Sequence, residues 1–263
     1  MLETSKIHGT LKSSGPWGPI QLLEVCDSTN QVALDAAKAG APEGLVVSSE
    51  VQTAGRGRQR RLWHSPGGLN LYFSVLLRPR VAQNRLSQLA MLAALGLHQA
   101  LQQIAPELSI DLKWPNDLWH HGRKLSGILC ECPPQTGDRC AIVIGLGLNV
   151  NAQREDFPPE LQHTATSLAI AAGHPFQRET ILAAFLDNFG DIYNKWLNTN
   201  DLNIFLPVWE KHDLLIGRTI TVIRPTDRLI GQALGLTPGG LLRLEVDGRE
   251  TIITAGDVHL ELE

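Results

Sequence analysis

The sequence predicts an α+β fold: a mixed β-sheet with flanking helices, followed by a small C-terminal β-barrel domain. Up to residue 213, apolar strand patterns and leucine- or alanine-rich helical patterns both occur, but they do not alternate strictly. Strict alternation is typical of a doubly wound parallel sheet, which is therefore disfavoured. From residue 214 onward, short apolar runs separated by glycine-containing turns recur at about ten-residue spacing, as in small barrels and sandwiches. We predict one domain over residues 1–213 and a second over residues 214–263.

The elements of the larger domain follow from the period of its apolar residues. Its expected strands are residues 20–26, 44–50, 69–77, 109–113, 125–132 and 141–149. Its expected helices run from residues 27–30 to Gly40 and over residues 85–104, 179–197 and 201–212. Polar residues 27–30 can cap the first helix, and Pro106 ends the second. Residues 114–117, with sequence WPND, are expected to form a turn.

The smaller domain is expected to contain strands only. Its apolar runs are residues 219–223, 229–236, 241–246 and 251–254. Each run is too short for a helix of ordinary length, and each is bounded by turn-forming residues. Four short strands in succession predict an all-β unit.

The composition indicates a globular protein of ordinary charge. Apolar residues make up 43% of the chain, which is enough for a substantial core and argues against disorder. The formal net charge is −4 and the pI is near 6.1, which argues against a general nucleic-acid-binding protein. The sequence shows no signal-peptide pattern and no apolar run of membrane-spanning length. We therefore expect a cytoplasmic protein with no membrane partner.

The four cysteines are expected to be buried free thiols. Cys130 and Cys132 lie two residues apart in an expected strand, where alternation directs both to one face. A zinc site would favour a C-x-x-C spacing with histidines nearby. Cys26 and Cys140 complete the set, which is too sparse for a disulfide scaffold in a chain of 263 residues.

One segment concentrates positive charge on flexible backbone. The stretch GRGRQRRLW, residues 55–63, holds four arginines. The planar fork of arginine suits phosphate and carboxylate groups, and glycine lets the backbone approach a ligand closely. By itself this segment is compatible with nucleotide phosphates, with a nucleic-acid backbone, or with a solvated loop that binds nothing.

Three further segments place polar residues or glycines at strand ends. They are DSTN (residues 27–30), KWPND (113–117) with the nearby RKLSG (123–127), and GLGLNVN (145–151). Each has an ordinary explanation: DSTN can cap a helix, Lys124 can be a surface lysine, and GLGLN lacks the helix that follows a dinucleotide motif. No Walker-type phosphate loop occurs in the sequence.

Together, these segments closely resemble the motifs of biotin protein ligases. QTAGRGRQRRLW (residues 52–63), KWPNDL (113–118), RKLSGIL (123–129) and GLGLNVN (145–151) occur in the family's order and at similar spacing. The resemblance runs from about residue 20 to the C-terminus and includes DSTN, ATSL (165–168) and TAGDV (254–258). As a set these motifs are highly specific.

The resemblance implies an ATP-dependent ligase whose residues 1–213 form the biotin- and ATP-binding catalytic domain. Biotin's carboxylate attacks the α-phosphate of ATP, giving biotinyl-5′-adenylate and pyrophosphate. A lysine of the biotin carboxyl carrier protein of acetyl-CoA carboxylase then attacks the adenylate, and AMP leaves. The first step brings negative charges together, so the site must supply positive charge, and Mg²⁺ is expected to accompany ATP.

The resemblance also implies which residues form the site. Lys124 and Arg58 are expected to be catalytic. The expected biotin-binding residues are Ser28, Thr29, Asn30, Gln52, Gly55, Arg56, Gly57, Arg58, Lys124, Gly127 and Gly145. The expected ATP- or adenylate-binding residues are Arg58, Arg61, Trp63, Asn116 and Asn149. Asp117 is expected to hold a metal ion or to orient a partner.

Two departures from the family's pattern stand out. Arg60 occupies a position where the family often has glycine, and a positive φ there would strain arginine by roughly 1–2 kcal/mol. Only nineteen residues precede the first expected strand, so the ligase-only class, without a DNA-binding domain, is expected. No DNA partner is therefore expected, whereas a homodimer is one expectation for the assembly.

Three other interpretations are open at this point. A lipoate–protein ligase or octanoyltransferase shares the catalytic fold, although the GRGR and KWPND segments favour biotin. A nucleic-acid-binding module would use the arginines on phosphates, but the net charge and the lack of a second basic stripe disfavour it. A catalytically inactive carrier-binding scaffold is disfavoured by the presence of Arg58 and Lys124.

Overall fold

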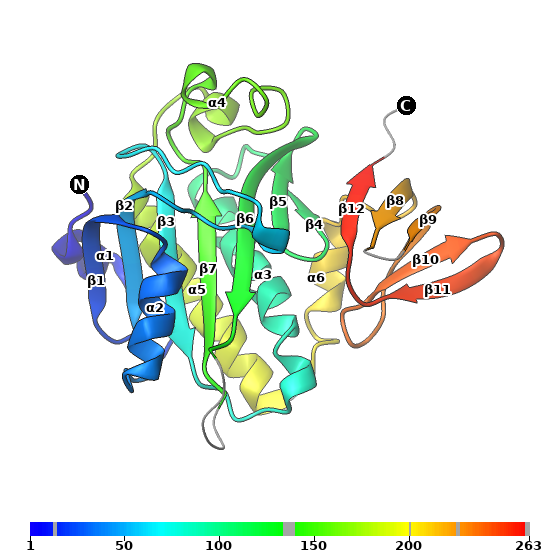
Figure 1. Ribbon diagram of the computed structural model, residues 1–263, viewed down its shortest axis with the longest axis horizontal. Helices are drawn as coiled ribbons and strands as arrows, with labels where there is room; N and C mark the ends of the chain where they lie inside the picture. The colour runs from blue at the N-terminus through cyan, green and yellow to red at the C-terminus, as the bar shows by residue number, and fades with distance from the viewer. Residues whose placement is uncertain (13–14, 134–139, 200, 225–226, 261–263) are drawn as a thin grey trace.

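A seven-stranded mixed β-sheet forms the larger part of the molecule (Figure 1). The computed structural model describes residues 1–12, 15–133, 140–199, 201–224 and 227–260. The strand order is β1-β2-β3-β7-β6-β5-β4, with β1 and β2 parallel and the other neighbours antiparallel. The strands are β1 (Ile20–Cys26), β2 (Val46–Gln52), β3 (Leu71–Leu77), β4 (Asp111–Lys113), β5 (Asp117–His120), β6 (Arg123–Glu131) and β7 (Ile142–Leu148).

Helices cover both faces of this sheet. Figure 1 shows α3 and α5 behind the sheet, and they pack against one another, with α1 against α5. The helix α2 lies on the opposite face, where it contacts β2, β3 and β7. The helices are α1 (Thr4–Thr10), α2 (Thr29–Lys38), α3 (Gln88–Ile104), α4 (Leu168–Ala172), α5 (Arg178–Thr199) and α6 (Leu206–Lys211). Because α2 is short, most of β6 and β7 stays uncovered by helix on its side.

A five-stranded antiparallel sheet forms the C-terminal part. Its order is β11-β10-β9-β8-β12, so β11 and β12 are its edges among the described residues. The strands are β8 (Thr219–Ile223), β9 (Arg228–Leu236), β10 (Leu242–Val246), β11 (Arg249–Ile253) and β12 (Asp257–Leu260). Figure 1 shows β12 as the strand of this sheet that stands closest to β4 and β5.

The two sheets share one continuous apolar core. Phe185 and Phe189 of α5 are fully buried in this core, where they stack on each other, and Trp209 of α6 is a fully buried member of the same cluster. That cluster continues through Leu215 to Ile220 in β8. Val258 of β12 belongs to the same cluster, so packing holds β12 against the larger part. A domain boundary between residues 213 and 214 stays a prediction.

The predicted fold class is confirmed, and most strand bounds agree within two residues. Among the α-helices and strands of the described residues, four short elements were missed: α1, α4, β5 and β12. They contain four to seven residues, too few for a repeating apolar pattern to identify them. The helix expected over residues 201–212 was too long, because α6 begins only at Leu206.

The cysteine prediction was only partly right. No disulfide links the cysteines in the described part of the chain, but Cys132 is exposed and Cys26, Cys130 and Cys140 are half-buried. Cys132 follows the last residue of β6, where the strand leaves the cover of its neighbours. Residues in the interior of a strand are buried more reliably than residues at or beyond its end, which is why the prediction of burial was wrong for Cys132.

Candidate active site

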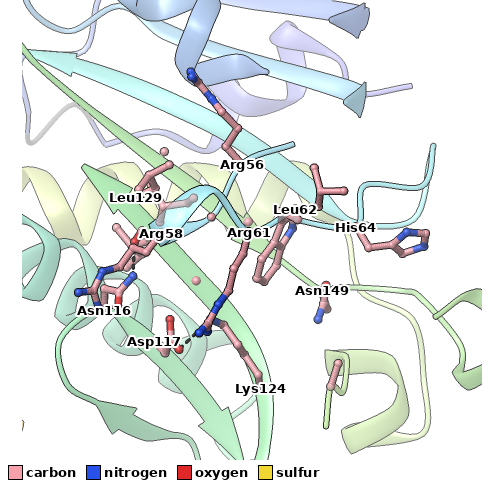
Figure 2. A pocket seen from close by; sticks show the side chains of 18 of the residues that line it. Arg56, Arg58, Arg61, Leu62, His64, Asn116, Asp117, Lys124, Leu129 and Asn149 are labelled. Atoms are coloured by element: carbon pink, nitrogen blue, oxygen red, sulfur yellow. Dashed lines mark hydrogen bonds and ion pairs between the residues drawn. The ribbon is translucent and has the colours of Figure 1, made fainter. Parts of the chain in front are cut away.

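A cavity of about 470 Å³ opens on the face of the large sheet that α2 leaves uncovered. This volume suits a small ligand, since ligand pockets typically enclose about 300–1,000 Å³. Its walls come from the start of α2, the loop after β2, the strands β5 to β7, and β12. Figure 2 shows side chains of the loop and of β5 and β6 directed toward one another across this space.

The start of α2 forms the first wall. Ser28, Thr29 and Asn30 are buried and line the cavity. Ser28 is the N-cap residue, but its side chain makes no capping hydrogen bond. The backbone N–H of Thr29 instead donates to Oε1 of Gln52 at 2.9 Å. The explanation of these residues as ordinary helix-capping groups is therefore wrong for Ser28.

The arginine loop, residues 55–63 after β2, folds back on itself as a small hairpin. The N–H of Gly57 donates to the carbonyl of Arg61 at 2.7 Å, and the N–H of Trp63 donates to the carbonyl of Gly55 at 2.9 Å. At its tip, Gln59 and Arg60 have φ of 53° and 61°. Two successive left-handed residues form the type of turn that closes tight hairpins and favours glycine. Arg60 therefore does have the positive φ that strains an arginine, and Gln59 has one as well.

The arginines of this loop point to different ends of the cavity. Figure 2 shows Arg56 directed toward α2, away from Arg58 and Arg61. Arg56 Nη2 lies 3.5 Å from a carboxylate oxygen of Glu131. Arg58 donates to Asn116 Oδ1 at 3.3 Å, and Arg61 pairs with Asp257 of β12. The loop therefore supplies positive charge at two separate places.

Lys124 and Asp117 form an ion pair on the floor of the cavity. Lys124 Nζ lies 2.7 Å from Asp117 Oδ2, and both side chains are only partly exposed. The other carboxylate oxygen, Oδ1, is buried and has no hydrogen-bond partner among the described residues. Mg²⁺ is typically held by one or two carboxylates together with substrate phosphates, so Asp117 Oδ1 fits that role. The described ranges contain no group of three His, Cys, Asp or Glu residues able to hold a metal ion by themselves.

Three glycines of β6 and β7 allow the side chains of Trp63 and Asn30 to pack closely on these strands. A Cβ at Gly147 would lie 2.4 Å from the indole of Trp63, and one at Gly127 would lie 3.1 Å from it. A Cβ at Gly145 would lie 1.9 Å from Asn30 Oδ1. The glycines inside these strands therefore make room for Trp63 and Asn30, not only for a ligand. The indole N–H of Trp63 is buried without a hydrogen-bond partner in the described residues, so it is available to a ligand.

The two asparagines expected near a nucleotide are buried at the edge of the cavity. Asn116 Nδ2 donates to the carbonyl of Ile128, which leaves its Oδ1 facing Arg58. Asn149 Nδ2 donates to the carbonyl of Thr166 at 2.9 Å. These bonds fix the orientation of both amides before any ligand arrives.

Lys113 is a pocket residue that the sequence interpretation missed. It is only 8% exposed, its Nζ donates to the carbonyl of Val258 at 2.6 Å, and it lies 4.4 Å from the ring centroid of Trp119. Burial lowers the pKa of Lys113 to about 8, an effect that the positive charges of Lys124 and Arg61 reinforce and the carboxylates of Asp117 and Asp257 oppose. The Val258 carbonyl is the one hydrogen-bond acceptor of the Lys113 ammonium among the described residues. Because an ammonium has three N–H donors, the others remain available to a ligand.

The cavity brings together nearly all the residues expected from the sequence. Gly55 does not line it, but lies at the neck of the loop, where a Cβ would lie 2.6 Å from the carbonyl oxygen of Trp63. Asp257, Val258 and His259 of β12 complete the lining from the C-terminal sheet.

Comparison with known proteins gives the family. Residues 22–149 match the model of the biotin/lipoate A/B protein ligase family. The bifunctional ligase/repressor BirA of Bacillus subtilis is 35% identical over 259 residues, covering 98% of this chain and 79% of that protein. The chain belongs to the biotin/lipoate A/B protein ligase family.

Other members of this ligase family agree with the assignment. The biotin–[acetyl-CoA-carboxylase] ligase of Mycobacterium tuberculosis is 33% identical, covering 93% of this chain and 90% of that protein. The structure of a biotin protein ligase from Aquifex aeolicus in complex with biotin and ATP superposes with a TM-score of 0.81. It is 28% identical and covers 94% of this chain and 100% of that one.

The residues missed by the sequence interpretation of this ligase had weak signals. Lys113 stood inside a quoted motif, but a lysine is buried too rarely for burial to be expected. Asp257 stood in the TAGDV motif without an assigned role. Glu131 lies between two cysteines, and nothing in the sequence indicates that its carboxylate contacts Asn30.

Proposed function

We propose that this protein is an ATP-dependent biotin–protein ligase that forms biotinyl-5′-adenylate and transfers biotin to a lysine of a carrier protein. The observation that carries the proposal is the convergence of two kinds of lining in one cavity. Uncharged polar side chains of α2 and β2 meet Arg58, Arg61, Lys113 and Lys124 there. The uncharged polar side chains suit a ring with N–H and C=O groups, and the positively charged side chains suit a polyphosphate.

The residues divide the work by their position. Ser28, Thr29, Asn30 and Gln52 would bind the ureido ring of biotin at the α2 end. Lys124 would lie by the biotin carboxylate and the α-phosphate, where it holds positive charge as the new bond forms. Arg58, Arg61 and Lys113 would hold the remaining phosphates, and Trp63, Asn116 and Asn149 the adenosine. Mg²⁺ would arrive with ATP and neutralise phosphate charge, with Asp117 as its protein ligand.

The carrier, the assembly and the location are finer parts of the proposal. The carrier is the biotin carboxyl carrier protein of acetyl-CoA carboxylase, in keeping with the name of the Mycobacterium tuberculosis relative. A homodimer and a cytoplasmic location stay predictions. In the described part of the chain no helix combines the length and apolar character needed to cross a membrane.

Exchange of radioactive pyrophosphate into ATP tests the first step without a carrier. Exchange should require biotin, because adenylate formation is a separate half-reaction. Lipoate and octanoate serve as the controls for the other activities of this fold. Exchange that runs equally without biotin, or only with lipoate, would contradict the proposal. Mass spectrometry of a carrier domain incubated with protein, biotin and MgATP then tests the transfer step.

A further inference from the structure

Glu131 contacts two residues that line the cavity without lining it itself. It is the last residue of β6 and pairs in register with Val143 of β7. Its Oε2 accepts a hydrogen bond of 2.7 Å from Asn30 Nδ2 and lies 3.5 Å from Arg56 Nη2. One carboxylate oxygen thus holds a side chain of α2 and a side chain of the arginine loop.

The Asn30 amide has one orientation because the two groups that face its nitrogen, the Glu131 carboxylate and the Leu129 carbonyl, can only accept hydrogen bonds, and the contact with Glu131 is the shorter one. An ionised carboxylate can only accept hydrogen bonds, so the atom that faces Glu131 must be the amide nitrogen. The same nitrogen also donates to the carbonyl of Leu129 at 3.2 Å. The amide oxygen is consequently turned toward Ser74, whose Oγ lies 2.6 Å away, over the position where Gly145 has no side chain.

This orientation sets the direction of the next hydrogen bonds. Ser74 Oγ lies within hydrogen-bond distance of both Asn30 Oδ1 and Thr29 Oγ1, at 2.6 and 2.8 Å, but a hydroxyl has one hydrogen. Since Asn30 Oδ1 can only accept, Ser74 donates its one hydrogen to it. Thr29 Oγ1 is then the donor of its own contacts, either to Ser74 Oγ or to Gln52 Oε1, which lies 3.2 Å away and can also only accept. The lone pairs of Thr29 Oγ1 and Asn30 Oδ1 that remain make this wall of the cavity an acceptor surface. Such a surface matches ligand N–H groups, of which a ureido ring has two.

Arg56 is fixed by the same carboxylate. Its guanidinium lies between Glu131 and Gln31, whose Oε1 accepts from Nη2 at 3.3 Å. The Nε–H of Arg56 is buried without a partner among the residues described. The arginine therefore keeps a free donor beside the acceptor surface.

We propose that Glu131 is a positioning residue for biotin, acting through Asn30 and Arg56. It determines which atoms of the ureido pocket accept and which donate, although it does not touch the ligand. The proposal rests on the proposed biotin ligase function. It assigns to Glu131 an effect on biotin binding and none on the phosphates, which lie at the other end of the cavity.

The test compares Glu131→Gln and Glu131→Ala with the parent in pyrophosphate exchange, varying biotin and ATP separately. The KM for biotin should rise about tenfold in Glu131→Ala, the fold-change for loss of one charge-assisted hydrogen bond at the low end of its range. Glu131→Gln keeps the shape and an acceptor, so its KM for biotin should rise less. The KM for ATP and kcat should stay within about twofold, and Glu250→Gln, which removes a surface pair with Arg243, is the matched control.

Exchanging the donor and acceptor roles of Asn30 and Glu131 gives a second readout. Asn30→Asp alone places two carboxylates face to face and should greatly weaken biotin binding, measured by calorimetry without ATP. Adding Glu131→Gln restores a donor opposite an acceptor and should recover much of that binding. A rescue of this kind is not expected if Glu131 only supports the fold.

Three outcomes would overturn the proposal. An unchanged KM for biotin in folded Glu131→Ala is one, and equal rises in the KM for biotin and for ATP are another. If Glu131→Ala melts far below the parent, the isosteric Glu131→Gln and the pair Asn30→Asp with Glu131→Gln test the proposal instead. The third outcome that would overturn it is then the absence of rescue in that pair. A parent without biotin-dependent exchange would instead overturn the proposed function, and this proposal with it.

Discussion

Lys124 Nζ and Asp117 Oδ2 lie 2.7 Å apart at the floor of the cavity, on neighbouring strands β6 and β5. The register places Gly127 opposite Asp117, so the Lys124 side chain extends along its own strand, over Gly127, to reach the carboxylate. A preformed pair holds the ammonium still before substrates arrive. Preorganised charge of this kind stabilises a transition state without reorganisation during the reaction.

Lys124→Ala should damage catalysis far more than folding. We expect the single-turnover rate of adenylate formation to fall by about 10²–10³, as for loss of one preorganised donor. The free energy of unfolding should fall by about 1 kcal/mol or less, because the pair is partly exposed to solvent. Lys124→Arg should restore only part of the rate, since a planar guanidinium does not replace a compact ammonium.

The matched control is Lys38→Ala, which breaks an exposed pair with Asp35 at 2.9 Å. It should leave both the rate and the melting curve unchanged. Adenylate formed at the parental rate by Lys124→Ala would make Lys124 an ordinary surface lysine.

Gly145→Ala should weaken biotin binding and also destabilise the fold. The added Cβ would lie 1.9 Å from Asn30 Oδ1, so Asn30 or β7 must move. Overpacking of this kind costs roughly 1–3 kcal/mol, and the displaced Asn30 leaves the acceptor surface incomplete. Calorimetry should show a Kd for biotin raised about tenfold or more, equal to about 1.4 kcal/mol. Gly9→Ala, where a Cβ meets nothing within 4 Å, is the control, and similar binding by both variants would refute the expectation.

Asp257→Ala should release the arginine loop from the C-terminal sheet. Arg61 pairs with Asp257, and Arg58 Nη2 donates to the carbonyl of Gly256 at 3.4 Å. With the first contact removed, trypsin should cleave faster after Arg58, Arg60 or Arg61 in the ligand-free protein. Biotin with ATP should slow cleavage in both proteins, because the anionic ligand orders the loop. Equal cleavage of variant and parent would mean that β12 does not hold the loop.

The sequence predicts local pattern better than it predicts burial and partners. Strands such as Ile20–Cys26 were predicted to the residue, because seven residues suffice to show an apolar run with clear ends. The strand Asp117–His120 was missed, because its first residue looked like part of a turn and its pairing with β6 is a tertiary property. Motif resemblance brought the cavity residues together, but it did not indicate which side chains already bind each other. The pairing of Arg61 with Asp257, 196 residues later, depends on how the second sheet packs.

Lys113 should make ATP binding weaken as the pH rises, in a pH range that the burial of this lysine determines. Burial lowers the pKa of Lys113 to about 8 from an ordinary value of 10.5. If its ammonium contacts ATP phosphates, ATP favours the protonated form, so binding is full below pH 8 and weakens as the pH rises above it. The KM for ATP should therefore rise by up to about tenfold per pH unit above 8. In Lys113→Met the KM for ATP should be high at every pH and should lack this rise.

Stability should change with pH in the opposite direction, which separates the two effects of this lysine. Between about pH 8 and pH 10.5 the unfolded chain keeps the Lys113 proton while the folded chain has lost it. Because the unfolded state then binds more protons, this group makes the folded state more stable as the pH rises through that window. Lys113→Met should lose that increment, as measured by urea unfolding at pH 7.5, 9 and 10.5. A KM for ATP with the same pH profile in parent and variant would exclude Lys113 from the phosphate site, whatever the unfolding curves show. If the KM profile changes but the stability profile does not, Lys113 binds phosphate without the burial that lowers its pKa.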